Sequence, residues 1–269
     1  MDNILEKIIT KKKKRINNYK KKNPESIIFE NIKKNDNYID LKNLIKKRKK
    51  ENKISIIAEI KKSSPSAGVI VENFNPLDIA KIYIENGASF LSVLTEEDFF
   101  LGKLDHVKNI KKKYKIPVLC KDFFIDTYQV ALAKSFDADC ILIILSAVDE
   151  ILAKDLYQAA NDLNISSLIE VHSTKEAETA MSFENSLIGI NNRNLKTFKV
   201  SLETSIELSR ILVSHNNPII SESGINSPED IKFILKNAKI YNFLIGESLL
   251  KSKNIGLKLK ELAQISVDI

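Results

Sequence analysis

The sequence has no tryptophan, two cysteines and three histidines among its 269 residues. Cys120 and Cys140 lie inside apolar runs, and two cysteines are too few for a disulfide framework, so we expect buried free thiols. His106, His172 and His215 are scattered without the spacing of metal ligands, and we predict no metal site. Without tryptophan, aromatic contacts from the N-terminal residues must come from tyrosine or phenylalanine.

Long apolar runs are also missing. No run is long enough to span a bilayer, which argues against a membrane-spanning protein. The first seven residues, MDNILEK, lack the order of charge, apolar stretch and cleavage site of a signal peptide, so we expect a cytoplasmic protein. The length suits one large domain with a single core.

The net charge of +7 arises at one end of the chain. Residues 1–53 contain 18 Lys/Arg and 7 Asp/Glu, about +11, whereas residues 54–269 contain 24 and 28, about −4. Lysine runs such as Lys11–Lys14 can bind nucleic acid or anionic surfaces. They also fit solvated helix faces, and no nucleic-acid-binding fold signature accompanies them. We therefore expect no nucleic-acid partner.

Apolar segments that end in polar residues recur from residue 54 onward. We predict strands at 54–60, 88–94, 117–120 and 140–145, with four more that end at Glu170, Asn191, Ser221 and Ile245. Segments of helical period lie near 78–86, 104–114, 126–135, 148–163, 173–183, 201–212, 227–237 and 247–262. Near-continuous apolar strands are typical of parallel strands buried on both faces. One chemistry-capable residue after each strand is typical of a (β/α)8 active site.

The predicted fold class is therefore α/β, a single (β/α)8 TIM barrel at 54–269 with an N-terminal helical extension at 1–53 that packs on it. In the extension, Ile4, Leu5, Ile8 and Ile9 repeat at helical spacing. A second helix is expected from Leu41 through Lys49, with Leu41, Leu44 and Ile45 directed inward. These helices could close the barrel floor or the edge over its active site.

Glu59 and Lys61 follow the first strand and precede a Ser/Pro turn at Ser63–Ser66. Two residues apart on a strand, their side chains point to the same face. On a buried face such a pair is costly unless it has a function. A surface ion pair at a strand end is the alternative.

Glycine loops follow the last two predicted strands. Ser223-Gly224 and Gly246-Glu247 place glycines where backbone N–H groups can approach a ligand closely. The second loop opens a helix, and phosphate often binds after strands seven and eight of this barrel class. The glycines could instead serve only as turn residues.

Lys121 and Glu170 each end an apolar strand. Partial burial could lower the pKa of Lys121 and make it a general acid. Burial would raise the pKa of Glu170, while a neighbouring lysine would hold it ionised. Each could also be a member of a structural ion pair.

Six segments in unbroken order resemble one family. They are Ile57–Ser66 (IAEIKKSSPS), Ser92–Thr95 (SVLT), Pro117–Phe123 (PVLCKDF), Ile188–Leu195 (IGINNRNL), Ser221–Ile225 (SESGI) and Leu244–Leu249 (LIGESL). Together they resemble indole-3-glycerol phosphate synthase, an enzyme of tryptophan biosynthesis, from about residue 3 to 265.

The resemblance implies conversion of 1-(2-carboxyphenylamino)-1-deoxyribulose 5-phosphate to indole-3-glycerol phosphate, CO₂ and water, without metal or organic cofactor. It implies that Lys121 protonates the substrate carbonyl, that Glu170 is the second acid/base, and that Lys61 holds the substrate carboxylate. Glu59 and Asn191 would orient these groups.

The resemblance also implies a set of binding residues. Ser64, Phe99, Phe123, Arg193, Glu222 and Ser223 would bind the substrate, and Gly224, Gly246 and Glu247 its phosphate. We expect one activity only, from a chain that we favour as a monomer.

The closest rival is a phosphoribosylanthranilate isomerase-type barrel, which uses a Cys/Asp acid–base pair. Cys120 is adjacent to Lys121, so its side chain should point away from the face of that lysine. A nucleic-acid-binding protein acting through its basic N-terminal residues is the rival from another class.

Overall fold

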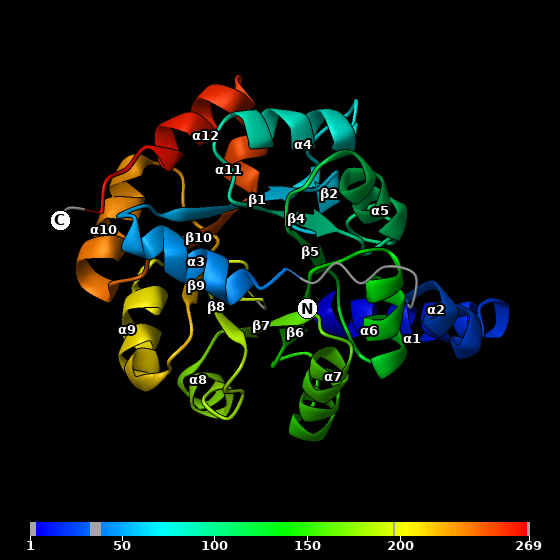
Figure 1. The fold of residues 1–269 in the computed structure, drawn as a ribbon. Coiled ribbons are helices and arrows are strands. Elements are labelled where there is room, and N and C mark those ends of the chain that lie inside the picture. The colour runs from blue at the N-terminus through cyan, green and yellow to red at the C-terminus, as the bar shows by residue number, and fades with distance from the viewer. Residues whose placement is uncertain (1–3, 33–38, 196, 268–269) are drawn as a thin grey trace.

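The computed structural model describes residues 4–32, 39–195 and 197–267, which contain a closed barrel of eight parallel strands ringed by helices (Figure 1). Around the barrel the strand order is β1-β10-β9-β8-β7-β6-β5-β4. The barrel strands are β1 (Ser55–Ile60), β4 (Phe90–Leu94), β5 (Val118–Lys121), β6 (Cys140–Ile144), β7 (Ser166–Val171), β8 (Leu187–Asn191), β9 (Ile219–Glu222) and β10 (Asn242–Ile245). The predicted fold class is confirmed, and the predicted division at residues 53 and 54 stays a prediction.

A helix follows each barrel strand and packs on its outer face. These helices are α4 (Pro76–Glu85), α5 (Leu104–Lys113), α6 (Thr127–Ser135), α7 (Glu150–Asp162), α8 (Thr174–Ala180), α9 (Glu203–Ile211) with the 3-10 turn η1 (Leu212–Ser214), α10 (Pro228–Ala238), α11 (Glu247–Leu250) and α12 (Ile255–Ala263). The predicted helix over 247–262 is therefore two helices, because Asn254 begins a new one by accepting the N–H of Leu257. A two-stranded hairpin, β2 (Ser63–Ser64) and β3 (Gly68–Val69), occupies the loop after β1 and was not predicted.

Successive side chains along each strand point to opposite faces, so the apolar residues form an outer core under the helices and an inner core inside the barrel. On β1, Ile56, Ala58 and Ile60 face the surrounding helices, whereas Ile57 packs inside the barrel. The barrel interior contains large apolar side chains from the strands, among them Phe90, Leu119, Leu142, Leu168, Leu187, Ile220 and Leu244. This filling leaves only the carboxyl ends of the strands open to a ligand.

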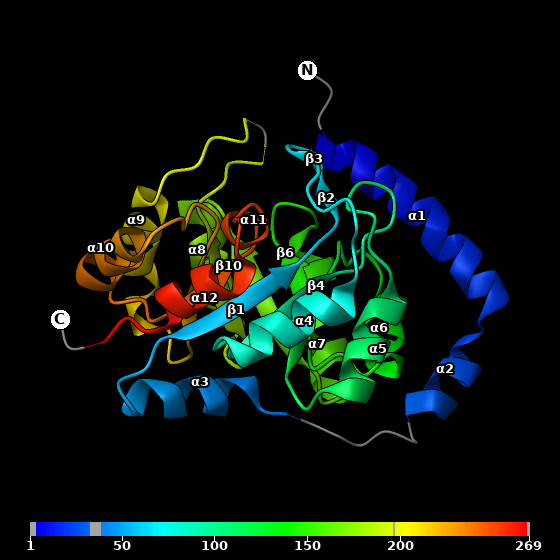
Figure 2. The same cartoon turned by 90° about the horizontal axis from the view of Figure 1, so that it is seen from above.

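Within residues 4–32 and 39–53, three helices precede the barrel: α1 (Ile4–Lys22), α2 (Glu25–Ile32) and α3 (Leu41–Lys50). Figure 2 shows the start of α1 beside the β2–β3 hairpin, at the carboxyl-end mouth of the barrel, and α3 across the opposite end. Leu41 and Ile45 of α3 join the inner core and close the barrel floor. Leu44 is 38% exposed, contrary to prediction, because it lies roughly 80° round the helix from the Leu41–Ile45 face.

The sequence did not predict α2. Its Ile28 is buried with Tyr128 and Leu132 of α6, and the Tyr128 hydroxyl donates to the carbonyl of Asn23. Ile16 of α1 and Ile28 of α2 both belong to an apolar cluster with α6, the helix that follows β5. This attachment connects the N-terminal helices to the strand that carries Lys121.

Candidate active site

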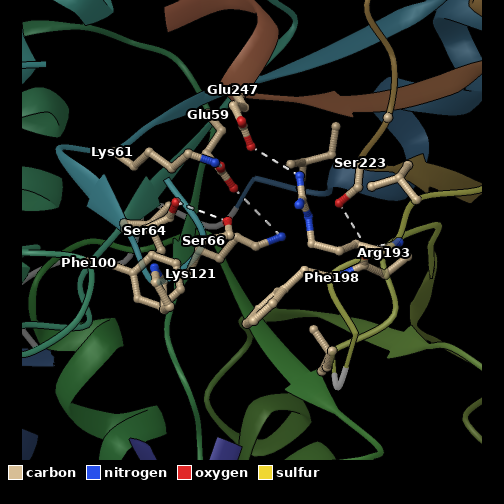
Figure 3. Close-up of a pocket in the computed structure, with 18 of the residues that line it drawn as sticks. Glu59, Lys61, Ser64, Ser66, Phe100, Lys121, Arg193, Phe198, Ser223 and Glu247 are labelled. Atoms are coloured by element: carbon tan, nitrogen blue, oxygen red, sulfur yellow. Dashed lines mark hydrogen bonds and ion pairs between the residues drawn. The ribbon is translucent and has the colours of Figure 1, made fainter. Parts of the chain in front are cut away.

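A cavity of about 720 Å³ opens at the carboxyl ends of the strands (Figure 3). Its volume is in the range of small-molecule sites. Ile4, Leu5 and Ile8 of α1 line one part of it, so the predicted apolar stripe lies partly over this mouth. The β2–β3 hairpin and the loop after β8 supply other walls.

All but two of the predicted site residues line this one cavity. Those that do are Glu59, Lys61, Ser64, Lys121, Phe123, Glu170, Asn191, Arg193, Ser223, Gly224, Gly246 and Glu247. Glu222 lies against Lys121 without lining the cavity. Phe99 is also absent from the lining, contrary to prediction: the next residue, Phe100, forms the wall, and the Phe99 ring packs against the Lys11 ammonium, 4.9 Å from its centroid.

Lys121 lies among three buried carboxylates. Its Nζ is 2.7 Å from Glu222 Oε2, 3.6 Å from Glu170 Oε2 and 3.8 Å from Glu59 Oε2. The four side chains come from β1, β5, β7 and β9, alternate strands of the barrel. Four side chains from alternate strands form one layer inside such barrels, and in this layer all four are charged.

Burial alone would lower the pKa of Lys121, but Glu222, Glu170 and Glu59 raise it above its ordinary value. The lowered pKa expected from the sequence is therefore wrong, because three carboxylates outweigh desolvation. The pKa of Glu222 is raised to about 7, mainly by burial. Repulsion by Glu170 and Glu59 also raises it, whereas the attraction of Lys121 lowers it. Glu222 Oε1 has no hydrogen-bond partner in the described part of the chain.

Glu170 is held ionised instead. Burial would raise its pKa, but Lys121, His172 and Asn191 lower it to about 2. Asn191 Nδ2 donates to Glu170 Oε1 at 3.1 Å, and Asn191 Oδ1 accepts the Ser223 hydroxyl at 2.8 Å. The backbone N–H of Arg193 also donates to Asn191 Oδ1, and this fixes the orientation of the Asn191 amide.

Glu59 of β1 and Lys61, the residue that follows this strand, point to the same side, as their spacing predicts. Lys61 Nζ is 2.7 Å from Glu59 Oε1, and the two side chains are 11% and 7% exposed, so the surface-pair alternative is wrong. Gly246 leaves room for this carboxylate: a Cβ there would contact Glu59 Oε1 and lie 2.9 Å from Glu59 Cβ. Gly189 of β8 makes room for the Glu222 carboxylate in the same way.

The loops after β9 and β10 meet at one side of the cavity. Gly224 has φ +82°, and a Cβ there would contact Val200. Glu247, the first residue of α11, pairs with Arg193 at 3.0 Å (Figure 3). It also pairs with Lys251 at 2.6 Å. The backbone N–H groups that begin α11 and the nearby cations suit an anionic group.

The N-terminal helix α1 reaches the same site through a buried ion pair that the sequence did not predict. Lys12 Nζ is 2.6 Å from Asp122 Oδ1, with side-chain exposures of 6% and 9%. Asp122 also accepts the Thr95 hydroxyl and the Phe123 N–H. The expectation that Lys11–Lys14 form only a solvated face is therefore wrong for Lys12.

Other basic residues of α1 also pair with the barrel. Arg15 contacts Glu97 and Asp98, and Lys20 Nζ is 2.8 Å from Asp126. The positive N-terminal part thus meets negative loops of the barrel. Lys12, Arg15 and Lys20 account for part of this complementarity between the positive N-terminal residues and the negative barrel.

Cys120 does not fit the Cys/Asp rival. It packs in the outer core, away from the face of Lys121, and burial raises the pKa of its thiol to about 12. In the described part of the chain, no group of three or more His, Cys, Asp or Glu residues could hold a metal ion. None of the described helices is long and apolar enough to cross a membrane.

A barrel with a lysine–carboxylate layer under an open cavity, and an anion-suited loop pair beside it, defines a (β/α)8 enzyme of acid–base chemistry. A family model described as "Indole-3-glycerol phosphate synthase" matches residues 5–262. The chain belongs to the indole-3-glycerol phosphate synthase family, whose activity is that of a carboxy-lyase in tryptophan biosynthesis.

Curated relatives support this membership along the whole chain. A protein named indole-3-glycerol phosphate synthase from Legionella pneumophila (strain Lens) is 42% identical over 262 residues, covering 97% of this chain and 99% of the relative. Its namesake from Lachnoclostridium phytofermentans is 40% identical over 275 residues, with the same coverage of both chains.

Solved structures share the fold at low identity. A 3-hexulose-6-phosphate synthase structure aligns with a TM-score of 0.62 and 14% identity, covering 78% of this chain and 98% of that one. An N-(5'-phosphoribosyl)anthranilate isomerase from Pyrococcus furiosus aligns with a TM-score of 0.56 and 15% identity, covering 78% and 97%. At this identity the likeness concerns the barrel alone.

Proposed function

We propose that this chain closes the indole ring of 1-(2-carboxyphenylamino)-1-deoxyribulose 5-phosphate by Lys/Glu general acid–base catalysis. The observation that carries the proposal is the Lys121 ammonium, held within 3.8 Å of three carboxylates at the cavity floor. The product is indole-3-glycerol phosphate, with release of CO₂ and water.

Lys121 acts as the general acid in ring closure. As the aromatic carbon attacks the substrate carbonyl carbon, the carbonyl oxygen becomes an alkoxide, which is a stronger base than an amine. A lysine with a raised pKa is fully charged at neutral pH and still transfers its proton to such an oxygen. Glu222, 2.7 Å away with a pKa of about 7, is suited to return a proton to Lys121 between turnovers.

Loss of CO₂ then restores the aromatic ring, and dehydration completes the indole. Glu170 is the second acid/base in this step, starting as the carboxylate that its low pKa favours. Lys61, beside Glu59, holds the substrate carboxylate until it leaves as CO₂ and assists proton transfer. Asn191 keeps Glu170 and the Ser223 hydroxyl in fixed positions.

The remaining lining residues bind the two ends of the substrate. Gly224, Gly246 and the backbone N–H of Glu247 hold the phosphate, with Arg193 close by. Phe123 and Phe100 form the apolar wall for the anthranilate ring, and Ser64 lies at its edge. Phe100 takes the place that the sequence assigned to Phe99.

The setting of the enzyme is a further part of the proposal. The two buried free thiols suit a reducing compartment such as the cytoplasm. The ion pair between α1 and the barrel leaves less of the positive charge of α1 for nucleic acid. We propose a monomer, which light scattering during gel filtration would test.

The test of the function is formation of indole-3-glycerol phosphate, followed by indole absorbance, by the purified chain. The proposal predicts turnover with added chelator and no added cofactor. A correctly folded chain that binds the substrate and leaves it unchanged would overturn it.

A further inference from the structure

Two charged side chains, His172 and Glu176, lie in a row behind the Glu170 carboxylate, and the proposed reaction does not use them. His172 is the second residue after Glu170, and its Nε2 lies 3.2 Å from Glu170 Oε1. On the other side of the ring, Nδ1 lies 3.4 Å from Glu176 Oε2. The imidazole thus lies between two carboxylates, one at the cavity and one at the start of α8.

The local sequence explains this arrangement. Ser173 begins α8 by accepting the Glu176 N–H, and Glu176 Oε2 accepts the His172 N–H at 2.7 Å. Ser-x-x-Glu is a capping pattern at helix starts. Here its glutamate reaches back to His172, and the turn places the imidazole against Glu170.

We propose that His172 is a positioning residue, which with Glu176 behind it keeps Glu170 ionised and held in place for the proposed reaction. The proposal rests on the role proposed for Glu170. Two contacts then share Glu170 Oε1, the Asn191 amide and the imidazole, while Oε2 faces Lys121.

Electrostatics support this role. Burial would lower the pKa of His172, but Glu170 and Glu176 raise it to about 9, so the ring is an imidazolium at neutral pH. The contact with Glu170 is an ion pair and not an aligned hydrogen bond, because Nε2 has no aligned acceptor in the described part of the chain.

Charged groups from three other strands surround the Glu170–His172 pair. Glu170 faces Lys121 from β5, Glu222 from β9, Glu59 from β1 and His172. His172 faces only Glu170 and Glu176 in the described part of the chain. Removing the imidazolium therefore leaves Glu170 with Lys121 as its cation, and the pKa of Glu170 should rise.

The alternative is that Glu176 and His172 only begin the helix. The pH dependence of kcat/KM separates the two roles. Its ascending limb, on the acid side of the profile, reports the pKa of the Glu170 carboxylate. A residue that only caps the helix changes stability and leaves this limb in place. In His172→Gln the apparent pKa of that limb should rise by about 1–3 units, the effect of losing one close opposite charge. Lys175→Gln, which also removes one positive charge but at an exposed position of α8, should leave the apparent pKa of that limb unchanged.

A second measurement needs no turnover. NMR titration of the wild-type chain should give an imidazole that titrates near 9, falling toward 6.5 in Glu176→Gln and staying near 9 in Glu178→Gln. A His172 that titrates near 6.5 in the wild type, or a His172→Gln limb that overlays the wild type, would overturn the proposal. Absence of turnover in the wild type would instead count against the proposed function.

Discussion

Lys12 offers the sharpest test of how α1 is attached, because it is the buried lysine in a run of exposed ones. In Lys12→Met the aliphatic stem remains and the charge is lost, which leaves the Asp122 carboxylate buried without its cation. Breaking a buried ion pair in this way costs about 3–5 kcal/mol. Lys13→Met removes a charge from an exposed position of the same helix and should cost less than about 0.5 kcal/mol.

The loss should appear as detachment of α1 and not as unfolding of the barrel, because the pair lies between the two. Hydrogen exchange measures that local opening. A loss of 3–5 kcal/mol corresponds to exchange of α1 amides that is faster by about 10²-fold or more. The Michaelis constant should also rise, since Ile4, Leu5 and Ile8 line the cavity.

A double-mutant cycle isolates the pair itself. In an Asp122→Asn background Lys12 has already lost its carboxylate partner, and Lys12→Met then leaves no unpaired charge, so the substitution should cost much less there than in the wild type. Equal α1 protection in Lys12→Met and Lys13→Met would refute the reasoning. So would costs that simply add in the cycle.

Three further outcomes follow from the structure. Deleting residues 1–45 should lower the melting temperature and weaken substrate binding, since it opens the barrel floor at Leu41; full affinity with an unchanged melting temperature would contradict this. Gly246→Ala should lower kcat in steady-state assays, because the new methyl displaces the Glu59 carboxylate; a change in KM alone would point to the phosphate instead. His172, whose pKa rises from 6.5 to about 9 on folding, should contribute roughly 3 kcal/mol that is fully present below pH 6.5 and lost as pH rises through 9. Urea denaturation of wild type and His172→Gln across pH 6–10 should give curves that converge at the alkaline end, and a constant gap would contradict this.

The barrel and most of its site were predictable because parallel strands place their ends at one mouth. The two-residue spacing of Glu59 and Lys61 already implied one shared face, and the structure pairs them at 2.7 Å. The same spacing relates Glu170 and His172, and it would have revealed their contact.

Other features depend on positions that no local pattern encodes. The burial of Lys12 is set by the rotation of α1 about its axis and by Asp122, which is distant in sequence. Phe99 and Phe100 are neighbours in an aperiodic loop, so the sequence could not tell which ring faces the cavity. The raised pKa of Lys121 requires three carboxylates to converge from three strands.

The most direct test of the proposed chemistry is the turnover of Lys121→Met, measured as indole-3-glycerol phosphate formed under saturating substrate. Circular dichroism should first establish a folded barrel, because the variant leaves three buried carboxylates without their shared cation. The account predicts a kcat lower by about 10²–10⁴-fold, the range for a lost general acid, with a smaller effect on substrate binding. A folded variant with a kcat close to that of the wild type would contradict it.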